Sequence, residues 1–384
     1  NDYKRESFLD TNDNQVSYQD FINKEFIHFS KYDCDRSIPN IMDGLKISLR
    51  KILFAAFKKN LVNEIKVAQF SGYVSEHSCY HHGEASLNQA IKGMAQNFVG
   101  SNNINLLLPN GQFGTRLQGG EDSASERYIF THLNKLTRYL FPQLDDTILK
   151  YLDDDGTFVE PTFYAPILPN ILINGTKGIG TGFSTDIMCY NPIDLVKYIR
   201  HKLKPSEFTE TCTSFIPYYE GFIGEILPVS DSKFIIKGIY EKISVDKIRV
   251  TELPVGFWTQ DFKELLENLI DNTDKNGKKV TPLIKDYDDM SKDTTVDFTI
   301  TFAKGKLAEL ESNVGEHNLN GVHKLLKLVS THTNTNMHLF DSDDKLKKYN
   351  SVSQIIDDYF DVRLNLYDVR KKHIISLLEH ELIV

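Results

Sequence analysis

The sequence predicts an α+β protein, because a helical first half precedes a segment of short strands and a long final helix. Apolar residues recur at helical spacing over 42–57, 62–70 and 86–99. Short β-branched segments alternate with one helix over 215–302. Residues 351–384 contain neither glycine nor proline and predict one helix that continues past the end of the chain, where its partner surface is expected.

Length and composition describe an ordinary globular protein of two or three domains. The chain has 384 residues, of which 40% are hydrophobic and 25% charged. No apolar run reaches the roughly 18 residues of a membrane-spanning helix, and no signal peptide is recognised. Four widely spaced cysteines favour free thiols over disulfides. Because the first residue is Asn1 rather than Met, we expect a piece of a longer protein.

The net charge of −9 excludes a uniformly basic protein but not a nucleic-acid binder, because binding depends on where charge lies. Residues 31–66 contain eight Lys or Arg against four acids, whereas acids concentrate in 144–155 and 284–297. The charge is therefore segregated, with its basic part upstream of Tyr128.

The first half is expected to begin with a polar arm at 1–30 and to continue with helices. After the first two helices, Gly72 is expected to break the chain before the third, whose N-cap lies near Ser86. Two helices, a turn and a third helix are compatible with a helix-turn-helix, whose last helix enters a groove. Many helical cores share this pattern, so it is weak evidence by itself.

The following segments mix strands, loops and helices. We expect a strand and loop over 104–118, a helix over 128–141 and an apolar run over 165–184 that ends in a glycine-dense loop. A helix near 259–270 and a charged, mobile insertion around 271–293 are expected further on. The strand-forming segments are 223–227, 234–239, 247–251 and 296–301.

Residues 111–131 carry the clearest chemical pattern. Four glycines, three small hydroxyl residues and two arginines lead into Tyr128. Glycines let the backbone approach a bulky ligand, and arginines offer forked donors that suit phosphate. A phenol beside guanidinium groups can act as a nucleophile toward phosphorus. From these residues alone, Tyr128 is either such a nucleophile or one of 18 tyrosines that packs at the start of a helix.

Two other clusters resemble ligand sites only in part. Residues 77–82 contain three histidines and one cysteine, but zinc sites need a second ligand pair at defined spacing, and none is evident. The glycine-dense loop at 178–182 lacks the Gly-Lys-Ser/Thr ending of a Walker loop. We therefore expect neither zinc nor ATP to bind there.

Several motifs, in the same order, resemble those of type II DNA topoisomerases. They are residues 36–46 (RSIPNIMDGLK), 66–72 (KVAQFSG), 80–87 (YHHGEASL), 95–103 (AQNFVGSNN) and 172–182 (LINGTKGIGTG). The resemblance runs from about residue 30 to the end and includes Thr-Glu-Leu-Pro at 251–254 and Trp-Thr-Gln at 258–260. It is to the eukaryotic branch, which large nucleocytoplasmic DNA viruses share, rather than to bacterial gyrase.

The resemblance implies the breakage-reunion region, or DNA gate, of an ATP-dependent enzyme. Its parts are an N-terminal lead-in at 1–30, a winged-helix domain at 31–190, a mixed α/β tower domain at 191–350 and the start of a helical coiled-coil C-gate at 351–384. In this family, each tyrosine of a homodimer attacks one strand of double-stranded DNA. A second duplex passes through the resulting 5′-phosphotyrosyl break, which is then religated.

Four residues match the family's catalytic positions. Tyr128 matches the nucleophile, and Arg127 matches the arginine that stabilises charge on the scissile phosphate. His82 matches a histidine that bonds this phosphate or assists proton transfer, and Arg36 matches a further phosphate contact. Because a phenol has a pKa of about 10, some group must take the proton of Tyr128 or stabilise its phenolate.

The expected DNA contacts are Lys46, Arg50, Lys66, Gln112, Arg116 and Ile179. Lys46, Arg50 and Lys66 are expected to touch phosphates and so to position DNA without reading its sequence. A solvated basic helix face explains each of them nearly as well. Ile179 matches the family's intercalating isoleucine, an apolar wedge that bends a duplex and thereby selects deformable DNA.

Two acids depart from the pattern of the family. Glu121 stands where relatives commonly carry lysine, and Glu126 where they carry proline before the Arg-Tyr pair. Carboxylates near bound phosphates are expected to weaken the affinity for DNA and to steepen its salt dependence.

The resemblance implies Mg²⁺ and ATP, both bound outside this chain by a TOPRIM domain and an ATPase domain. No metal ligand is expected here, because the aspartates at 153–155 lack the TOPRIM Glu-Gly-Asp context. The expected partners are double-stranded DNA, a second copy of the chain and those two portions of the same protein, with no membrane. The expected location is the nucleus for a cellular protein, and the host cytoplasmic viral factory, nucleus or virion for a viral one.

Two alternatives to a topoisomerase stay open. One is a non-catalytic winged-helix scaffold that binds DNA. The other is a topoisomerase-derived double-strand-break factor that cuts DNA without strand passage.

Overall fold

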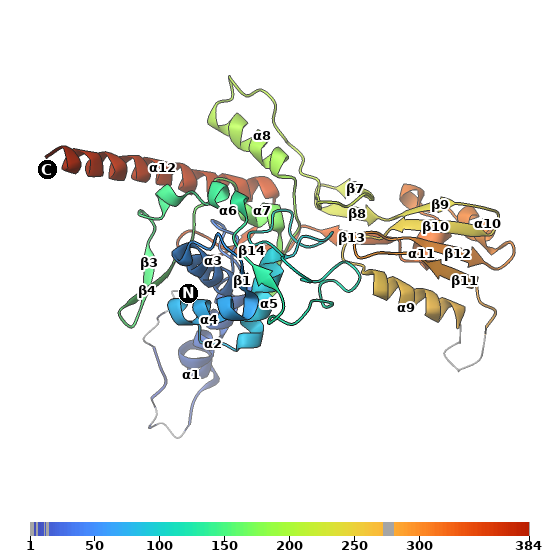
Figure 1. The fold of residues 1–384 in the computed structure, drawn as a ribbon, viewed down its shortest axis with the longest axis horizontal. Coiled ribbons are helices and arrows are strands. Elements are labelled where there is room, and N and C mark those ends of the chain that lie inside the picture. Colours follow the sequence, from blue (N-terminus) through green and yellow to red (C-terminus); the bar gives the residue numbers. More distant parts are fainter. Residues whose placement is uncertain (1–3, 5–6, 11, 13–14, 272–279, 384) are drawn as a thin grey trace.

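The structure, a computed structural model, describes residues 4, 7–10, 12, 15–271 and 280–383. Most of the buried apolar residues that it describes belong to two large hydrophobic cores, and a third, small cluster consists of Cys34, Ile38 and Phe340. The larger core draws on the helices of the first half and on the root of the last helix, and the smaller core lies within 248–328. Figure 1 shows the two bodies side by side, with the last helix, α12 (Val352–Ile383), projecting from the larger body away from the smaller one.

Consecutive helices form the N-terminal side of the larger body. They are α1 (Tyr18–Phe21), the π-helix η1 (Ile22–Phe26), α2 (Ile27–Ser37), α3 (Ile47–Lys59), α4 (Val67–Ser78) and α5 (Glu84–Ala95). The polar arm expected over 1–30 is therefore helical from Tyr18 onward.

The helix expected over 42–57 starts later, at Ile47. The residues before it form a turn in which the Gly44 amide donates to the Asn40 carbonyl (2.8 Å). Gly44 has a φ of +66°, and a β-carbon there would lie 2.5 Å from the Ile171 backbone nitrogen, so this turn requires glycine. The apolar spacing before Ile47 reflects burial in the turn rather than a helix.

The helix expected over 62–70 is wrong in its first half. Asn60 ends α3 in the left-handed conformation, and strand β1 (Ile65–Lys66) precedes α4. Gly72 does not break the chain but lies inside α4, with nothing within 4 Å of the position of a β-carbon. The third helix begins at Glu84, slightly earlier than expected.

The helix expected over 128–141 is also wrong in its first half. Strand β2 (Phe130–Thr131) pairs antiparallel with β1, and helix α6 comprises only Lys135–Leu140. Phe130 also exchanges two backbone hydrogen bonds with Asn110, of 2.9 and 3.0 Å. This pairing satisfies the backbone groups of the segment, and it overrides the apolar spacing.

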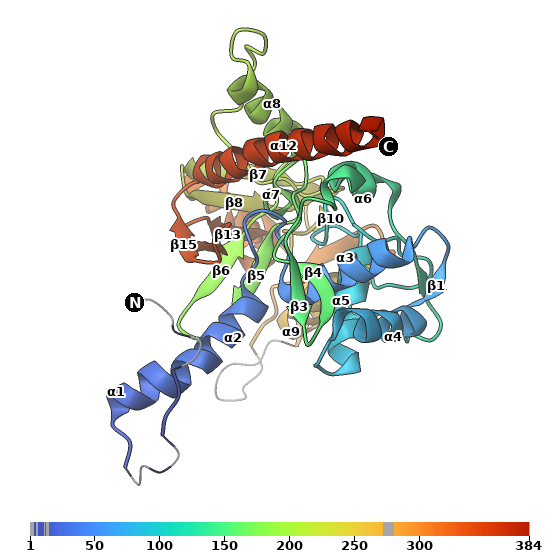
Figure 2. The same ribbon diagram turned by 90° about the vertical axis from the view of Figure 1, so that its left-hand side faces the viewer.

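Two hairpins and three helical segments complete this part of the larger body. They are η2 (Gln143–Asp145), the hairpin of β3 (Tyr151–Asp154) with β4 (Thr157–Pro161), α7 (Asn170–Asn174), the hairpin of β5 (Thr176–Ile179) with β6 (Ser184–Ile187), and α8 (Pro192–Leu203). The expected apolar run forms the buried α7, and the glycine-dense loop joins β5 to β6 beside α2 (Figure 2).

The smaller body contains the sheet β11-β12-β10-β9 and borders the sheet β13-β8-β7. The strands are β7 (Glu225–Ser230), β8 (Lys233–Lys237), β9 (Ile239–Lys242), β10 (Lys247–Glu252), β11 (Ile284–Asp289), β12 (Phe298–Phe302) and β13 (Val329–Thr333). The helical segments are α9 (Thr259–Ile270), α10 (Lys306–Ser312), η3 (Glu316–Asn318) and α11 (Gly321–Leu325).

The strands and the helix expected over 215–302 are confirmed with small shifts. The mobile insertion expected over 271–293 is wrong in part, because β11 lies in this segment and pairs with β12 at the sheet edge. Residues 272–279 of the insertion lie outside the described residues.

The chain returns to the larger body before its last helix. β14 (Met337–Phe340) pairs with β15 (Leu346–Tyr349), and Phe340 bridges to Asn40. The long helix expected over 351–384 is confirmed as α12. Its root is buried, and Asp145 forms ion pairs with Arg363 (2.8 Å) and Arg370 (3.1 Å) of this helix. Among the described residues, no helix combines the length and the apolar character needed to cross a bilayer.

Phe262 links α9 to the sheet of the smaller body, since its ring meets the ring of Phe298 edge-on at 4.9 Å between centroids. Phe262→Ala leaves a cavity in this core and should lower the free energy of unfolding by about 3–5 kcal/mol. Urea denaturation measures this loss. Val245→Ala, at a position that is 73% exposed, should change it by less than about 0.5 kcal/mol. Equal effects of the two substitutions would contradict the described core.

Candidate functional site

A pocket of about 480 Å³ brings together two of the four expected catalytic residues. It lies where α2, the start of α3 and the turn between α4 and α5 meet, and Arg36 and His82 line it. Tyr32, which also lines the pocket, was not expected from the sequence. Its spacing of four residues from Arg36 puts both on one face of α2, and this spacing could have identified it.

His82 is held in the pocket by aromatic neighbours. Its Nε2 lies 2.8 Å from the Tyr32 hydroxyl, and its ring meets the Tyr80 ring edge-on at 5.2 Å between centroids. Burial lowers the pKa of His82 below the usual 6.5, and the positive charge of Arg36 lowers it further. The imidazole is therefore neutral near pH 7 and can accept a proton or donate one.

Tyr128 projects from a turn that is tied to the N-terminus of α4. Its side chain is 74% exposed, and its amide donates to the Ser125 carbonyl (2.9 Å). The carbonyls on either side, of Glu126 and Ile129, accept from the first two amides of α4 at 3.1 and 3.0 Å. These bonds satisfy amides that have no partner within the helix, and they fix the position of the turn.

The structure does not bring all four expected catalytic residues together in one chain. Arg127 is exposed beside Tyr128 at the N-terminal end of α4, whereas His82 follows its C-terminal end. The 12 residues of α4 span about 18 Å at 1.5 Å per residue. Tyr128 and Arg127 therefore form one pair, and Arg36 and His82 form a second pair at the other end of the helix.

Three of the expected DNA contacts are polar side chains on the surface. Lys66 and Gln112 are exposed, and the Gln112 amide lies 3.4 Å from the Asp122 carboxylate. Lys46 is half-buried and donates to the Lys177 carbonyl at 2.8 Å. Burial lowers the pKa of Lys46 below its usual value.

Ile179 is 85% exposed at the tip of the β5–β6 hairpin. The hairpin backbone rests on α2, because a β-carbon at Gly178 would collide with the Ser37 carbonyl and one at Gly180 would lie 3.1 Å from the Cys34 sulfur. Glycine is therefore needed at both positions for this close approach, and the side chain of Ile179 between them points outward.

Two further expected DNA contacts, Arg50 and Arg116, are buried in ion pairs. Arg50 is 6% exposed, and its Nε and Nη2 lie 2.6 and 3.1 Å from the Asp43 carboxylate oxygens. Arg116 is 6% exposed and pairs with Glu252. Both guanidinium groups therefore bond a carboxylate inside the protein, which gives each arginine a structural role.

Residues 36–384 match the model of the DNA gyrase/topoisomerase IV A-subunit family. The chain belongs to this family. It is 47% identical over 379 residues to DNA topoisomerase 2 of Arabidopsis thaliana and 46% identical over 376 residues to that of Plasmodium falciparum, and both matches cover 98% of the chain. They cover 25% and 26% of the relatives, so the chain spans about a quarter of their length.

A solved structure agrees with this assignment to the topoisomerase family. The crystal structure of the Plasmodium falciparum topoisomerase II DNA-binding, cleavage and re-ligation domain is 46% identical, with a TM-score of 0.89, and the match covers 99% of this chain and 50% of that one. The expected resemblance to eukaryotic type II topoisomerases is confirmed, and so is the expected fold class.

The two acids that depart from the topoisomerase pattern lie in different surroundings. Glu121 is exposed. The Glu126 carboxylate lies 3.9 Å from the Lys92 ammonium, which also donates to the Ser123 hydroxyl at 3.2 Å. The charge of Glu126 is therefore partly matched within the protein, so Glu121 is the stronger candidate for repelling phosphate.

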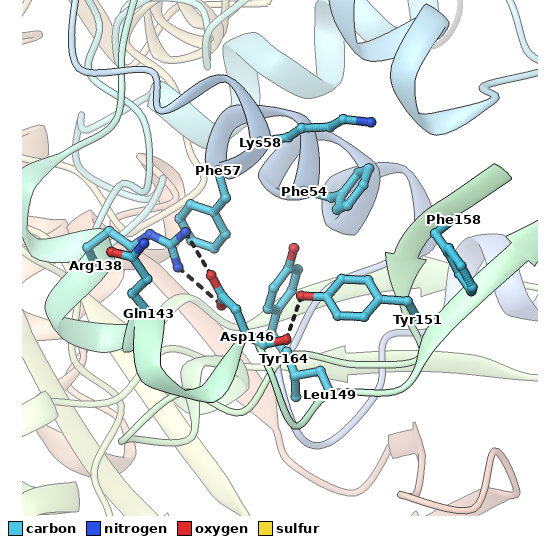
Figure 3. A pocket seen from close by; sticks show the side chains of 10 residues that line it. All are labelled: Phe54, Phe57, Lys58, Arg138, Gln143, Asp146, Leu149, Tyr151, Phe158 and Tyr164. Atoms are coloured by element: carbon cyan, nitrogen blue, oxygen red, sulfur yellow. Dashed lines mark hydrogen bonds and ion pairs between the residues drawn. The ribbon is translucent and has the colours of Figure 1, made fainter. Parts of the chain in front are cut away.

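A second pocket, of about 700 Å³, contains none of the expected site residues. Figure 3 shows its aromatic walls, with Arg138 and Asp146 in an ion pair of 3.0 Å at one side. The Tyr151 hydroxyl donates to the Asp146 carbonyl (3.0 Å), and burial raises the pKa of Tyr151 to about 12. In the part of the chain that the structure describes, no group of three His, Cys, Asp or Glu side chains could hold a metal ion.

Arg36→Gln removes a positive charge that disfavours the imidazolium of His82, so the pKa of His82 should rise toward 6.5. An NMR titration of the histidine resonances measures this change. Lys197→Gln, on the exposed side of α8, should leave the pKa unchanged. The pKa of His82 is lower in the folded protein than in the unfolded chain, so the unfolded chain takes up this proton more readily. The contribution of His82 should therefore lower the free energy of unfolding as the pH falls through 6.5. An unshifted pKa in Arg36→Gln would contradict the described proximity.

Arg50→Met and Lys66→Met should separate a structural cation from a cation that is expected to contact DNA. Arg50→Met leaves the Asp43 carboxylate buried and unpaired, which should cost about 3–5 kcal/mol of unfolding free energy. Lys66→Met should cost less than about 0.5 kcal/mol but reduce the salt slope of DNA binding by about 1. Urea denaturation and DNA titrations at several salt concentrations measure the two effects. A similar loss of stability in both variants would refute the distinction.

Proposed function

We propose that the full-length protein is an ATP-dependent type II DNA topoisomerase and that this chain is its DNA gate. The observation that carries the proposal is the exposed Tyr128 beside Arg127, in a turn bonded on both sides to the start of α4. A phenol held at a fixed backbone position beside a guanidinium suits attack on a phosphodiester. The similarity to a solved topoisomerase II cleavage and re-ligation domain supports this proposal.

In the proposed reaction, the Tyr128 oxygen attacks phosphorus, and the bond between phosphorus and the 3′ oxygen breaks. The products are a 5′-phosphotyrosyl ester and a 3′ hydroxyl, which takes up a proton in place of the one that the phenol loses. One phosphodiester replaces another, so attack by the 3′ hydroxyl reverses the step. Arg127 stabilises charge on the phosphate oxygens, and a neutral His82 is suited to move a proton.

Two copies of the chain are proposed to act together on double-stranded DNA, one on each strand. The separation of Tyr128 and Arg127 from Arg36 and His82 along α4 supports a site that is completed only when a second copy is present. Type II topoisomerases generally use Mg²⁺ and ATP, and we assign these to TOPRIM and ATPase portions of the same protein. Mg²⁺ supplies positive charge at the scissile phosphate when it is bound.

The proposed organisation is a lead-in at 1–30, a winged-helix domain at 31–190, a tower domain at 191–350 and the start of a C-gate at 351–384. The separate cores of the two bodies support this division, although β14 and β15 pack on the larger body. The eukaryotic relatives suggest a nuclear location for a cellular protein. For a viral protein, the viral factory, nucleus or virion is proposed.

Two alternatives are distinguished by activity. A non-catalytic scaffold would bind DNA without forming a covalent adduct, and a double-strand-break factor would form the adduct without strand passage. ATP-dependent decatenation of linked DNA circles by the full-length protein, together with adduct formation, favours the topoisomerase over both.

Tyr128→Phe removes the attacking oxygen, so the full-length protein should lose the DNA adduct that survives denaturation while its DNA affinity changes little. Denaturing gel electrophoresis of end-labelled DNA measures the adduct. Tyr139→Phe is a matched control, because Tyr139 is 75% exposed on α6 but lies outside the turn. An adduct that persists in Tyr128→Phe would remove this residue from its role.

A further inference from the structure

We propose that Glu252, in the smaller body, is a positioning residue for Tyr128, because it holds the glycine loop that leads to the nucleophile. The glycine loop is defined as residues 111–127. This inference rests on the proposed function, since it assigns a role in the same cleavage step. Glu252 lies at the end of β10, a strand whose neighbours belong to the smaller core.

The link begins with a buried ion pair. Arg116 of the glycine loop donates to both carboxylate oxygens of Glu252, which is 1% exposed. The same carboxylate accepts from the amides of Leu253 (2.9 Å) and Ile223 (3.3 Å). A carboxylate bonded on all sides has one orientation, so it fixes the guanidinium and with it the backbone at Arg116.

The start of α9 holds the loop at a second place. The amides of Thr259 and Gln260 donate to the carbonyls of Arg116 and Leu117 at 3.3 and 2.9 Å. Among the described residues, the N-cap Trp258 makes no side-chain hydrogen bond to the start of α9, and the loop supplies partners to amides that have none within the helix. Figure 1 shows α9 along the lower side of the smaller body, with one end close to the larger body.

Trp258 packs against the glycine loop at the same junction between the smaller body and the loop. Gly119 has a φ of +62°, and a β-carbon there would collide with the Trp258 indole. The indole also meets the Phe98 ring edge-on at 5.7 Å between centroids. The Trp258 ring therefore packs against both the glycine loop and the segment after α5.

Hydrogen bonds within the glycine loop connect its anchored part, around Arg116, with the segment that precedes Tyr128. The Asp122 carboxylate accepts from the Thr115 amide (2.8 Å) and hydroxyl (2.5 Å), and the Ala124 amide donates to the Gln112 carbonyl (2.9 Å). The described residues 111–127 contain neither helix nor strand. Contacts with the rest of the protein therefore decide where the loop, and the turn of Tyr128 after it, lie.

It follows that the smaller body takes part in aligning the nucleophile although it contributes no group to the chemistry. Displacement of a reacting atom by about 1 Å can reduce a rate by about 100-fold. Loss of the Glu252 contact should therefore slow cleavage more than it weakens DNA binding. This pattern separates a positioning role from a contact with DNA.

The test measures single-turnover formation of the covalent adduct by the full-length protein at saturating DNA, together with the dissociation constant for the same duplex. Glu252→Gln should slow adduct formation by about 10- to 100-fold while the dissociation constant changes by less than about threefold. Arg249→Gln is the matched control, because Arg249 lies on the same strand in an exposed ion pair with Asp297, and it should cleave at the normal rate.

Two further variants keep the test decisive if Glu252→Gln folds poorly. Gly119→Ala pushes the loop away from Trp258 without altering either core, and it should show the same slow cleavage with normal DNA affinity. Exchange of the charges, Arg116→Glu with Glu252→Arg, should recover part of the rate that Glu252→Gln loses. Normal cleavage by Glu252→Gln overturns the inference, and so does normal cleavage by Gly119→Ala.

The outcome for Tyr128→Phe separates this inference from the proposed function. If Tyr128→Phe abolishes the adduct and the variants of Glu252 and Gly119 cleave normally, only the positioning role is refuted. If Tyr128→Phe leaves the adduct intact, the proposed function of Tyr128 fails first.

Discussion

The buried carboxylate of Asp43 is the interaction on which the larger body depends. It is inaccessible to solvent and accepts from the Arg50 guanidinium and from the amides of Leu45 and Tyr164. Its backbone carbonyl accepts from the Asn170 side chain. One ionised residue therefore joins the turn before α3, α3 itself and the segment that leads to α7. Removal of any partner leaves polar groups buried and unsatisfied, so this junction tolerates little movement.

The arginines of this protein form two groups that differ in burial. Arg50 and Arg116 use their planar forks on carboxylates inside the protein, where the geometry of both groups matches. The guanidinium groups of Arg127 and Arg36 lie at the surface, beside Tyr128 and His82 respectively. The first kind joins separate segments of the fold, and the second kind places positive charge at the surface.

Long-range pairing explains most of what the sequence could not reveal. The strands over 215–302 and the last helix followed from local patterns that tertiary contacts reinforce. The late start of α3 and the strand at Phe130 depended on distant backbone partners, Ile171 and Asn110. Motifs named the candidate site residues by type, but they could not show that Arg50 is buried, because exposed and buried arginines look alike in sequence.

The start of α12 is buried in the larger body, whereas the rest of the helix projects from it. Beyond Arg363 the helix extends about 30 Å at 1.5 Å per residue, so a rotation of about 5° at the root moves its tip by about 3 Å. Asp145 pairs with both arginines at this root, and α6 lies in the chain between Asp145 and the segment that bears Tyr128. A small change of angle at the buried root is therefore amplified into a displacement of several ångströms at the projecting end of α12.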